Sequence, residues 1–209
     1  GKKCHGDSCA IFREVGNCVM PKEGIFCRVR EGGILKPGLT MEYHPYIFKA
    51  VVITLSDRAS NGEYDDLSGP KVLEHVESFM NASGCRFETE HHIIPDNPVQ
   101  LDALLKDASA REIDFIFTTG GTGIGPRDLT PEVVKNNLDK EIPGIMEGIR
   151  IKFGLEKPNA LLSRSIAGVM GDSLVFALPG SVKAVNEYMT EINKSLNHMV
   201  LMLHAINAH

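Results

Sequence analysis

Apolar positions change their spacing in a regular way from about residue 48 onward. The run 49–55 is almost continuously apolar and 114–119 is largely so, as in strands buried on both faces of a parallel sheet, and a further strand is expected over 87–94. Elsewhere apolar residues recur every three or four positions, which predicts helices over 70–80, 99–108, 131–138, 143–153 and 181–206. Two late strands, 165–170 and 173–178, flank Gly171-Asp172 and predict a hairpin.

Alternation of strands and helices predicts a three-layer α/β/α domain with a mostly parallel central sheet and one late hairpin. Within the helix at 70–80 we expect four apolar side chains to face inward: Val72, Leu73, Val76 and Phe79. Ser68 is the expected N-cap of this helix, because its hydroxyl can accept from the first turn, and Pro70 suits that turn.

The first 47 residues have a different character. They are rich in glycine, Ile25 to Arg30 partly alternates apolar and polar positions, and Gly32-Gly33 indicates a turn. A segment this short buries little core, so we expect a small β-rich tail. Pro45 disfavours a helix through the junction. The expected domains are therefore 1–47 and 48–209.

Charge separates the same two parts. The 209 residues carry a formal net charge of -5, with 7 basic and 5 acidic side chains in 1–47 and 15 and 22 in 48–209. This acidity argues against binding to nucleic acid or to an anionic membrane. The 43% hydrophobic content is globular, no apolar run reaches the roughly 18 residues of a membrane span, and no signal peptide is seen. We therefore expect a cytoplasmic protein.

Four of the five cysteines lie in the first 27 residues: Cys4, Cys9, Cys18 and Cys27. None forms a Cys-x-x-Cys pair, so the spacing does not favour zinc, and a reducing cytoplasm disfavours disulfides. Free thiols are the default expectation. His91 and His92 are neighbours in a strand and face opposite ways, so a shared metal site is not expected.

Ligands of an open parallel sheet bind beyond the carboxyl ends of its strands. The segments that follow the expected strands are Ser56-Asp57-Arg58, Pro95-Asp96, Gly120 to Glu132, and Pro179-Gly180-Ser181. All four are polar or rich in glycine. We expect them to meet at one edge of the sheet.

The segment from Gly120 to Glu132 is the most informative of these. Its glycines let the backbone approach a ligand, and Thr130-Pro131-Glu132 begins a helix whose amino end favours an anion. It lacks the Gly-Lys-Ser/Thr end of a Walker loop and the dinucleotide fingerprint. A glycine-rich turn without a ligand is the alternative.

These segments, with others in the same order, resemble the molybdopterin adenylyltransferase family of molybdenum-cofactor biosynthesis. The matching motifs are Ser56-Asp57-Arg58-Ala59-Ser60 with Gly62 and Tyr64, Ser68-Gly69-Pro70, Ile94-Pro95-Asp96, Thr119-Gly120-Gly121-Thr122-Gly123, Arg127-Asp128 with Thr130-Pro131-Glu132, Pro143-Gly144 with Glu147, Leu162-Ser163-Arg164-Ser165 and Leu178-Pro179-Gly180. The resemblance covers about 48–209. One position departs from the pattern, since Val182 stands where the family usually has proline.

Residues 1–47 resemble the carboxyl-terminal tail of a MOSC domain. The matching stretches are Gly1-Lys2-Lys3-Cys4-His5, Gly16 to Pro21, Glu23 to Phe26 and the Lys36-Pro37-Gly38 turn. Leu39 stands where such tails usually have aspartate, and most of that domain is absent from this chain. The resemblance also suggests that one cysteine carries sulfur, but it does not identify which of the four cysteines this is.

The resemblance implies that molybdopterin attacks the α-phosphate of ATP, giving adenylylated molybdopterin and pyrophosphate. Such chemistry relies on positioning and on stabilising charge. Because the second part is acidic and its substrates are polyanions, we expect Mg²⁺ as cofactor with ATP as co-substrate. Asp96 and Asp128 are the expected catalytic and metal-binding residues. For each, a helix cap or turn is the alternative.

The resemblance also suggests a larger set of substrate-binding residues. They are Ser56, Asp57, Arg58, Gly120, Gly121, Thr122, Gly123, Glu147, Ser163, Arg164, Pro179, Gly180 and Ser181. An Arg58–Asp57 surface pair is the alternative for Arg58, and structural salt bridges are the alternative for Glu147 and Arg164. For the glycine segment, the alternative is simple turn geometry.

Two other functions fit the same motifs. One is a non-catalytic module that binds molybdopterin or acts as a scaffold. The other is molybdate insertion, a later step that resembles longer multidomain proteins. The family also suggests a homotrimer, and a later-pathway molybdate-insertion protein as a partner.

Overall fold

The computed structural model describes residues 32–34, 36–40, 42 and 44–204. The chain divides into two compact units, Gly1–Tyr43 and His44–His209, where the sequence analysis places the boundary after residue 47. In the first unit the expected turn at Lys36-Pro37-Gly38 is present: the Leu39 amide donates to the Lys36 carbonyl, and Gly38 has φ of +90°. The cysteine segment, and most of the expected β-rich MOSC-like tail, lie outside the described residues.

The second unit is built on a six-stranded sheet with the order β2-β1-β3-β6-β5-β4. Its strands are β1 (Ile47–Leu55), β2 (Arg86–Ile94), β3 (Phe115–Thr119), β4 (Lys140–Glu141), β5 (Ile166–Met170) and β6 (Ser173–Leu178). The pairs β1–β2, β1–β3 and β3–β6 are parallel, whereas β5 runs antiparallel to both β4 and β6. The predicted parallel sheet and late hairpin are confirmed.

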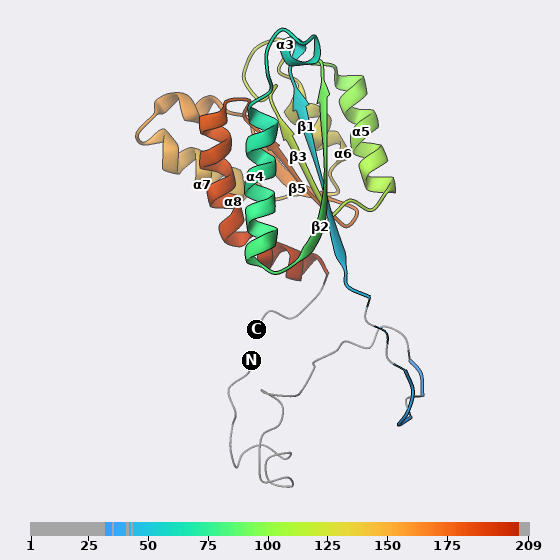
Figure 1. The fold of residues 1–209 in the computed structure, drawn as a ribbon. Helices are drawn as coiled ribbons and strands as arrows, with labels where there is room; N and C mark the ends of the chain where they lie inside the picture. The colour runs from blue at the N-terminus through green and yellow to red at the C-terminus, as the bar shows by residue number, and fades with distance from the viewer. Residues whose placement is uncertain (1–31, 35, 41, 43, 205–209) are drawn as a thin grey trace. The chain divides into compact units, whose positions relative to one another are not determined.

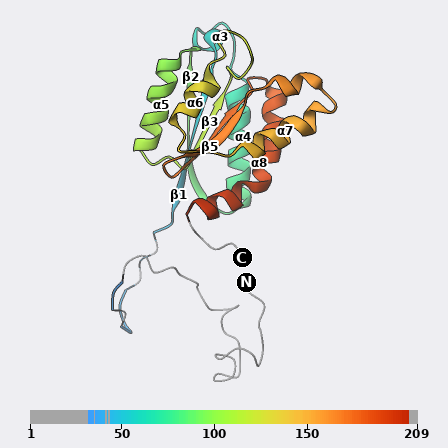
Figure 2. The same cartoon turned by 180° about the vertical axis from the view of Figure 1, so that it is seen from behind.

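Helices cover both faces of this sheet (Figure 1). They are α3 (Asp57–Ser60), α4 (Ser68–Ala82), α5 (Pro98–Ala110), α6 (Thr130–Asn137), α7 (Pro143–Gly154), the 3₁₀ helix η2 (Pro158–Leu162) and α8 (Val182–Leu203). Helices α4, α7 and α8 lie on one side and α5 and α6 on the other, as the view from behind also shows (Figure 2). The three-layer α/β/α architecture is therefore confirmed.

The strand pattern explains the two cores. Because successive strand residues face opposite ways, Val52 and Phe117 join the cluster under α4, α7 and α8, whereas Ile53 and Ile116 join the cluster under α5 and α6. Phe117 also stacks on Phe176 of β6, with ring centroids 5.2 Å apart. Burial on both faces is what the continuous apolar runs predict.

One helix start differs from its prediction. Ser68 is the first residue of α4 and does not cap it; the N-cap is Leu67, which makes no side-chain capping bond. The carboxylate of Asp66 takes this role, because its Oδ1 accepts from the backbone amides of Ser68 and Gly69 at 2.9 and 3.1 Å. The short elements α3, β4 and η2 are not among the predicted ones.

Within the described part of the chain, no helix is both long enough and apolar enough to cross a membrane.

Candidate active site at the carboxyl edge of the sheet

The strands β1, β2, β3 and β6 end at the same edge of the sheet, called here the carboxyl edge. Leu55 pairs with Ile94, and Thr119 pairs with both Thr54 and Leu178, so their last residues are in register. The four segments singled out in the sequence follow directly from these ends. The reversed strand β5 begins there, which adds Ser163, Arg164 and Ser165 to the same edge.

The loop after β3, residues 120–129, is shaped by its glycines. Gly120 and Gly121 have φ of +103° and +63°, a region that glycine tolerates and other residues rarely adopt. A Cβ on Gly120 would lie 2.3 Å from the Leu55 carbonyl oxygen. The amides of Gly121, Thr122 and Gly123 donate to no acceptor among the described residues. Their binding to an anion stays a prediction.

Arg164 braces this loop from across the edge. Its Nε donates to the Gly123 carbonyl at 2.7 Å, its two terminal nitrogens donate to the Asp128 carbonyl and the Glu132 carboxylate, and its backbone amide donates to the Thr122 carbonyl at 2.9 Å. The guanidinium thus holds three protein oxygens at once. These contacts match the structural alternative raised for Arg164 and fix the path of the glycine loop.

Asp57 organises the ends of β1 and β2. Its Oδ1 accepts from the Asp96 backbone amide at 2.9 Å, and its Oδ2 pairs with Arg127 at 2.5 Å. Arg58 instead lies over the Tyr64 ring, 5.4 Å from its centroid. The alternative of an Arg58–Asp57 surface pair is therefore wrong, because Asp57 is engaged by partners from two other loops.

The two expected catalytic carboxylates are placed differently from each other. Asp96 does not cap α5, since Asn97 takes that role and accepts from the amides of Val99 and Gln100. Asp128 does take part in a turn, because its Oδ2 accepts from the Gly125 amide at 2.8 Å. That bond orients the carboxylate over the glycine loop and engages one of its two oxygens.

Burial and neighbouring acidic side chains change the pKa of the Asp96 carboxyl. Burial raises the pKa of the Asp96 carboxyl above its ordinary value, and the charges of Asp57 and Asp128 raise it further; the Asp57 backbone amide and Arg127 offset this in part. Two further carboxylates are thus close enough to disfavour the charge on Asp96. A cation bound among them would relieve this cost.

This shift predicts a stability effect of Asp96→Asn. The Asp96 carboxyl has a higher pKa in the folded state than in the unfolded state. The folded state therefore loses stability as the pH rises from the unfolded-state pKa through the folded-state pKa, and this cost is fully present at neutral pH. We expect the substitution to increase the free energy of unfolding at neutral pH by less than about 1 kcal/mol, since the group is only partly buried. Urea denaturation at neutral and acidic pH measures it, and the gain should shrink in acid. A less stable variant at neutral pH would contradict this account.

A cleft of about 360 Å³ opens at the carboxyl edge, and Asp57, Asp96 and Asp128 are not among the residues that line it. Three segments line it: the end of β1 with α3, the approach to α4, and the loop after β6. The lining residues are Thr54, Leu55, Ser56, Arg58, Ala59, Tyr64, Asp66, Leu67, Ser68, Gly180, Ser181 and Val182. Its volume falls in the usual range of small-molecule sites, about 300–1,000 Å³. A second, much smaller crevice, near the size of one water molecule, is also lined by Leu55, together with Asp96 and Arg127.

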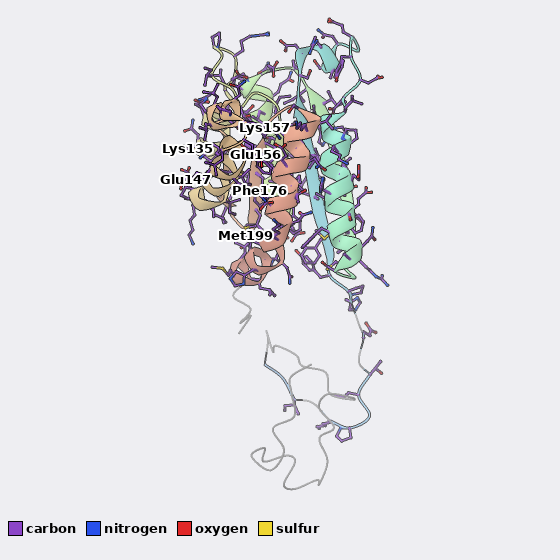
Figure 3. The ribbon with its side chains drawn as sticks, turned by 90° about the vertical axis from the view of Figure 1, so that its left-hand side faces the viewer. Lys135, Glu147, Glu156, Lys157, Phe176 and Met199 are labelled. Atoms are coloured by element: carbon purple, nitrogen blue, oxygen red, sulfur yellow. The ribbon has the colours of Figure 1, made fainter. Side chains whose placement is uncertain are left out.

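The structure brings most of the expected site residues together. Ser56, Arg58, Gly180 and Ser181 line the cleft, with Ser56 and Ser181 also capping α3 and α8. The Pro179 carbonyl accepts from the Thr119 hydroxyl, and the Ser163 hydroxyl is bonded to that of Ser165. Glu147 is exposed on the outer flank of α7 (Figure 3) and has no bond to the carboxyl edge among the described residues. Its role in binding stays a prediction.

Sequence reasoning missed several residues of the site. Arg127 is not among the site residues expected from the sequence, although it pairs with Asp57. Asp66 and Tyr64 line the cleft, and Val182 occupies its rim in place of a proline. The signal for Asp66 was its position two residues before the start of a helix, where a carboxylate can cap the first amides.

No group of three His, Cys, Asp or Glu side chains forms a ready-made metal site in the described part of the chain. Mg²⁺ does not require such a group, because it usually keeps several waters and binds one or two carboxylates together with substrate phosphates. Asp57, Asp96 and Asp128 supply carboxylate oxygens, the ligand type that Mg²⁺ takes, and the charges of Asp57 and Asp128 help to raise the pKa of the Asp96 carboxyl. The carboxylates present therefore suit Mg²⁺ held jointly with a phosphate.

Together these features define an α/β domain with free backbone amides, acidic side chains and a cleft at one edge of its sheet. The family model described as "Probable molybdopterin binding domain" matches residues 51–198. The chain belongs to this family.

Individual relatives agree with this assignment. The chain is 34% identical over 150 residues to "Molybdopterin adenylyltransferase" of Helicobacter pylori, which covers 71% of this chain and 84% of the relative. It is 34% identical over 160 residues to "Gephyrin" of Dictyostelium discoideum, covering 74% of this chain but only 22% of that longer protein. Among solved structures, the "tungsten cofactor synthesizing protein MoaB from Pyrococcus furiosus" superposes with a TM-score of 0.67 at 34% identity, covering 78% of this chain and all of that one.

Proposed function

We propose that this chain adenylylates molybdopterin in molybdenum-cofactor biosynthesis. An oxygen of the terminal phosphate of molybdopterin attacks the α-phosphorus of ATP. The bond from that phosphorus to the oxygen bridging the α- and β-phosphates breaks, and pyrophosphate leaves with that electron pair. The names of the similar proteins support molybdopterin as substrate, and the carboxyl edge supports phosphate chemistry.

One observation carries the proposal: free backbone amides and clustered carboxylates occupy the same edge. The amides of Gly121, Thr122 and Gly123 can donate to phosphate oxygens, while Asp128 is folded against the same loop through the Gly125 amide. Phosphoryl and nucleotidyl transfer depend mainly on positioning and on stabilising charge. This combination supplies donors for the anion and oxygens for a cation within one loop.

Asp96 and Asp128 are the residues proposed to hold Mg²⁺ with ATP. The ion, when bound, neutralises charge that develops on phosphate oxygens. Asp57 acts through its neighbours, since it holds the Asp96 amide and Arg127. The exposed guanidinium of Arg127 places a positive charge beside the carboxylates, where it offsets the net -7 formal charge of residues 48–209.

The 360 Å³ cleft is the proposed place for a flat heterocycle. Tyr64 presents a half-exposed ring with Arg58 over it, and Leu67 adds an exposed apolar side chain. The Ser56 and Ser181 hydroxyls and the Asp66 loop supply polar groups around it. Aromatic, apolar and polar groups thus converge on this cleft, as they do in sites that bind small molecules.

Turnover tests the proposal against a non-catalytic binding module. Purified chain is mixed with molybdopterin, ATP and Mg²⁺, and pyrophosphate release is followed in parallel with binding by calorimetry. We expect pyrophosphate to accumulate with molybdopterin and not with ATP alone. Binding of both ligands without pyrophosphate would favour the non-catalytic module and overturn the enzyme assignment.

We also propose the homotrimer suggested by the resemblance. Four large apolar side chains are exposed around the end of α7 and η2: Ile151, Leu155, Leu161 and Leu162. Leu155 is 84% exposed and lies one helical turn from Ile151. Exposed apolar patches of this kind mark protein interfaces. Light scattering should give the mass of three chains, and Leu155→Glu should lower it, whereas Val99→Glu on the distant exposed face of α5 should not. A wild-type mass of one chain would contradict the trimer.

A further inference from the structure

A buried polar cluster, defined by Thr54, Asp66 and His91, lies behind one wall of the cleft. Thr54 stands near the end of β1, Asp66 precedes α4, and His91 comes from the middle of the edge strand β2. The side chain of Asp66 is only 5% exposed and that of His91 is 21% exposed. Thr54 and Asp66 line the cleft, whereas the proposed reaction gives His91 no role.

Asp66 is saturated with hydrogen bonds. Its Oδ1 accepts from the Ser68 amide, the Ser68 hydroxyl and the Gly69 amide, and its Oδ2 accepts from the Thr54 hydroxyl at 2.6 Å. Burial acts to raise the pKa of the Asp66 carboxyl, but the bonds from Thr54, Gly69 and Ser68 outweigh it and hold the pKa below its ordinary value. Asp66 is therefore an ionised anchor for α4 and is not free to act as a base.

The hydrogen count fixes the role of His91. The hydroxyl of Thr54 has one hydrogen, and the 2.6 Å bond uses it toward Asp66. His91 Nε2 then faces two acceptors, Thr54 Oγ1 at 3.0 Å and Asp66 Oδ2 at 3.1 Å. Only a protonated Nε2 satisfies both, since a bare nitrogen would set a lone pair against a carboxylate. The imidazole must donate from Nε2.

The start of α4 is built against this donor. A Cβ on Gly69 would lie 2.2 Å from His91 Nε2, 2.4 Å from Asp66 Oδ2 and 2.5 Å from Thr54 Oγ1. The backbone of α4 therefore packs directly on the cluster as well as donating to it. Leu67 and Ser68, which precede and begin the helix, form part of the cleft wall. The cluster and this wall of the cleft are therefore in direct contact.

We propose that His91 is a positioning residue: its Nε2–H holds Thr54 and Asp66 in place, and Asp66 in turn fixes the first turn of α4 as a rigid wall of the cleft. The consequence for ligand affinity rests on the proposed function, because it takes the cleft as the binding site. The effect on α4 itself does not depend on any ligand.

Hydrogen exchange tests the effect on α4 without a ligand. In His91→Ala we expect the Ser68 and Gly69 amides to exchange about 10-fold faster or more, because their acceptor is loosened, while amides of β3 stay protected. His91→Gln carries an amide donor that can reach the same acceptors and should restore most of the protection. His92→Ala is the matched control, since His92 is the next residue of β2 and faces the other way toward Glu90. Unchanged exchange in His91→Ala would overturn the proposal.

Binding tests the consequence for the cleft. With Mg-ATP and molybdopterin, His91→Ala should raise the KM or Kd of the ligand in the cleft about 5- to 20-fold while kcat changes less than about 2-fold, the pattern of lost ground-state binding. His91→Gln should lie near the wild type. Faster exchange with unchanged affinity would overturn the positioning role. Absence of turnover in the wild type would instead overturn the proposed function and leave the exchange result to stand.

Discussion

Asp128→Asn should leave the fold intact and reduce pyrophosphate release by about 100-fold or more, as expected for loss of a charged metal ligand. Asparagine keeps an oxygen of the same size, so the bond from the Gly125 amide to this side chain can persist. The substitution removes the negative charge and little else. Steady-state pyrophosphate release with saturating Mg-ATP and molybdopterin measures the loss, and circular dichroism checks the fold.

The matched control is Asp107→Asn. Asp107 is an exposed carboxylate on α5 that pairs with Arg111 one turn away, outside the carboxyl edge. We expect Asp107→Asn to keep full activity. That result would show that losing one negative charge from an acidic domain is not enough to reduce pyrophosphate release. Asp128→Asn with wild-type turnover would remove Asp128 from the metal-binding role.

Gly120→Ala should cost about 3–5 kcal/mol of folding free energy, combining backbone strain with a steric clash. The backbone has φ of +103°, and the new Cβ would fall 2.3 Å from the Leu55 carbonyl oxygen. That oxygen belongs to the backbone of β1, which is paired on both sides, and cannot turn aside like a flexible side chain. A loss of this size is a large part of the 5–15 kcal/mol that usually stabilises a domain. Urea denaturation gives the measurement.

Two other glycines separate the causes of that loss. Gly84 has φ of +65° but nothing within 4 Å of its Cβ position, so Gly84→Ala should cost only about 1–2 kcal/mol from the backbone. At Gly121, with φ of +63°, the Cβ would meet the Thr130 hydroxyl at 2.4 Å, a side chain, so Gly121→Ala should fall between the two. If Gly120→Ala proved no worse than Gly84→Ala, the close approach to Leu55 would carry no energetic weight.

The sheet and its working edge could be predicted because they follow from local patterns. Strands such as 114–119 are apolar on both faces, and the rule that ligands bind beyond parallel strand ends placed Asp96 and Gly120 at one edge. The cap of α4 could not be predicted the same way. Ser68 has the right residue type for an N-cap. The capping group is instead the carboxylate of Asp66, which is held by the hydroxyl of Thr54, twelve residues before Asp66 in the chain.

Contacts between distant segments account for the rest. The sequence does not decide whether Arg164 binds a ligand or forms a structural salt bridge. The groups that accept its hydrogen bonds lie 32 to 41 residues earlier in the chain. Strand alternation predicts that His91 and His92 lie on opposite faces. It does not show that His91 lies within hydrogen-bonding distance of Thr54 and Asp66. Such pairings depend on how strands and loops pack in three dimensions.

The reversed strand β5 divides the domain into two poles. Because β5 begins where β6 ends, one pole holds the ends of β1, β2, β3 and β6 together with the start of β5, and the segments there constrain one another through Arg164 and Asp57. The opposite pole receives the tight turn of the hairpin, Gly171-Asp172, away from the carboxylates and the cleft. Insertions and sequence drift should therefore accumulate at the hairpin pole, while the other pole evolves as a unit.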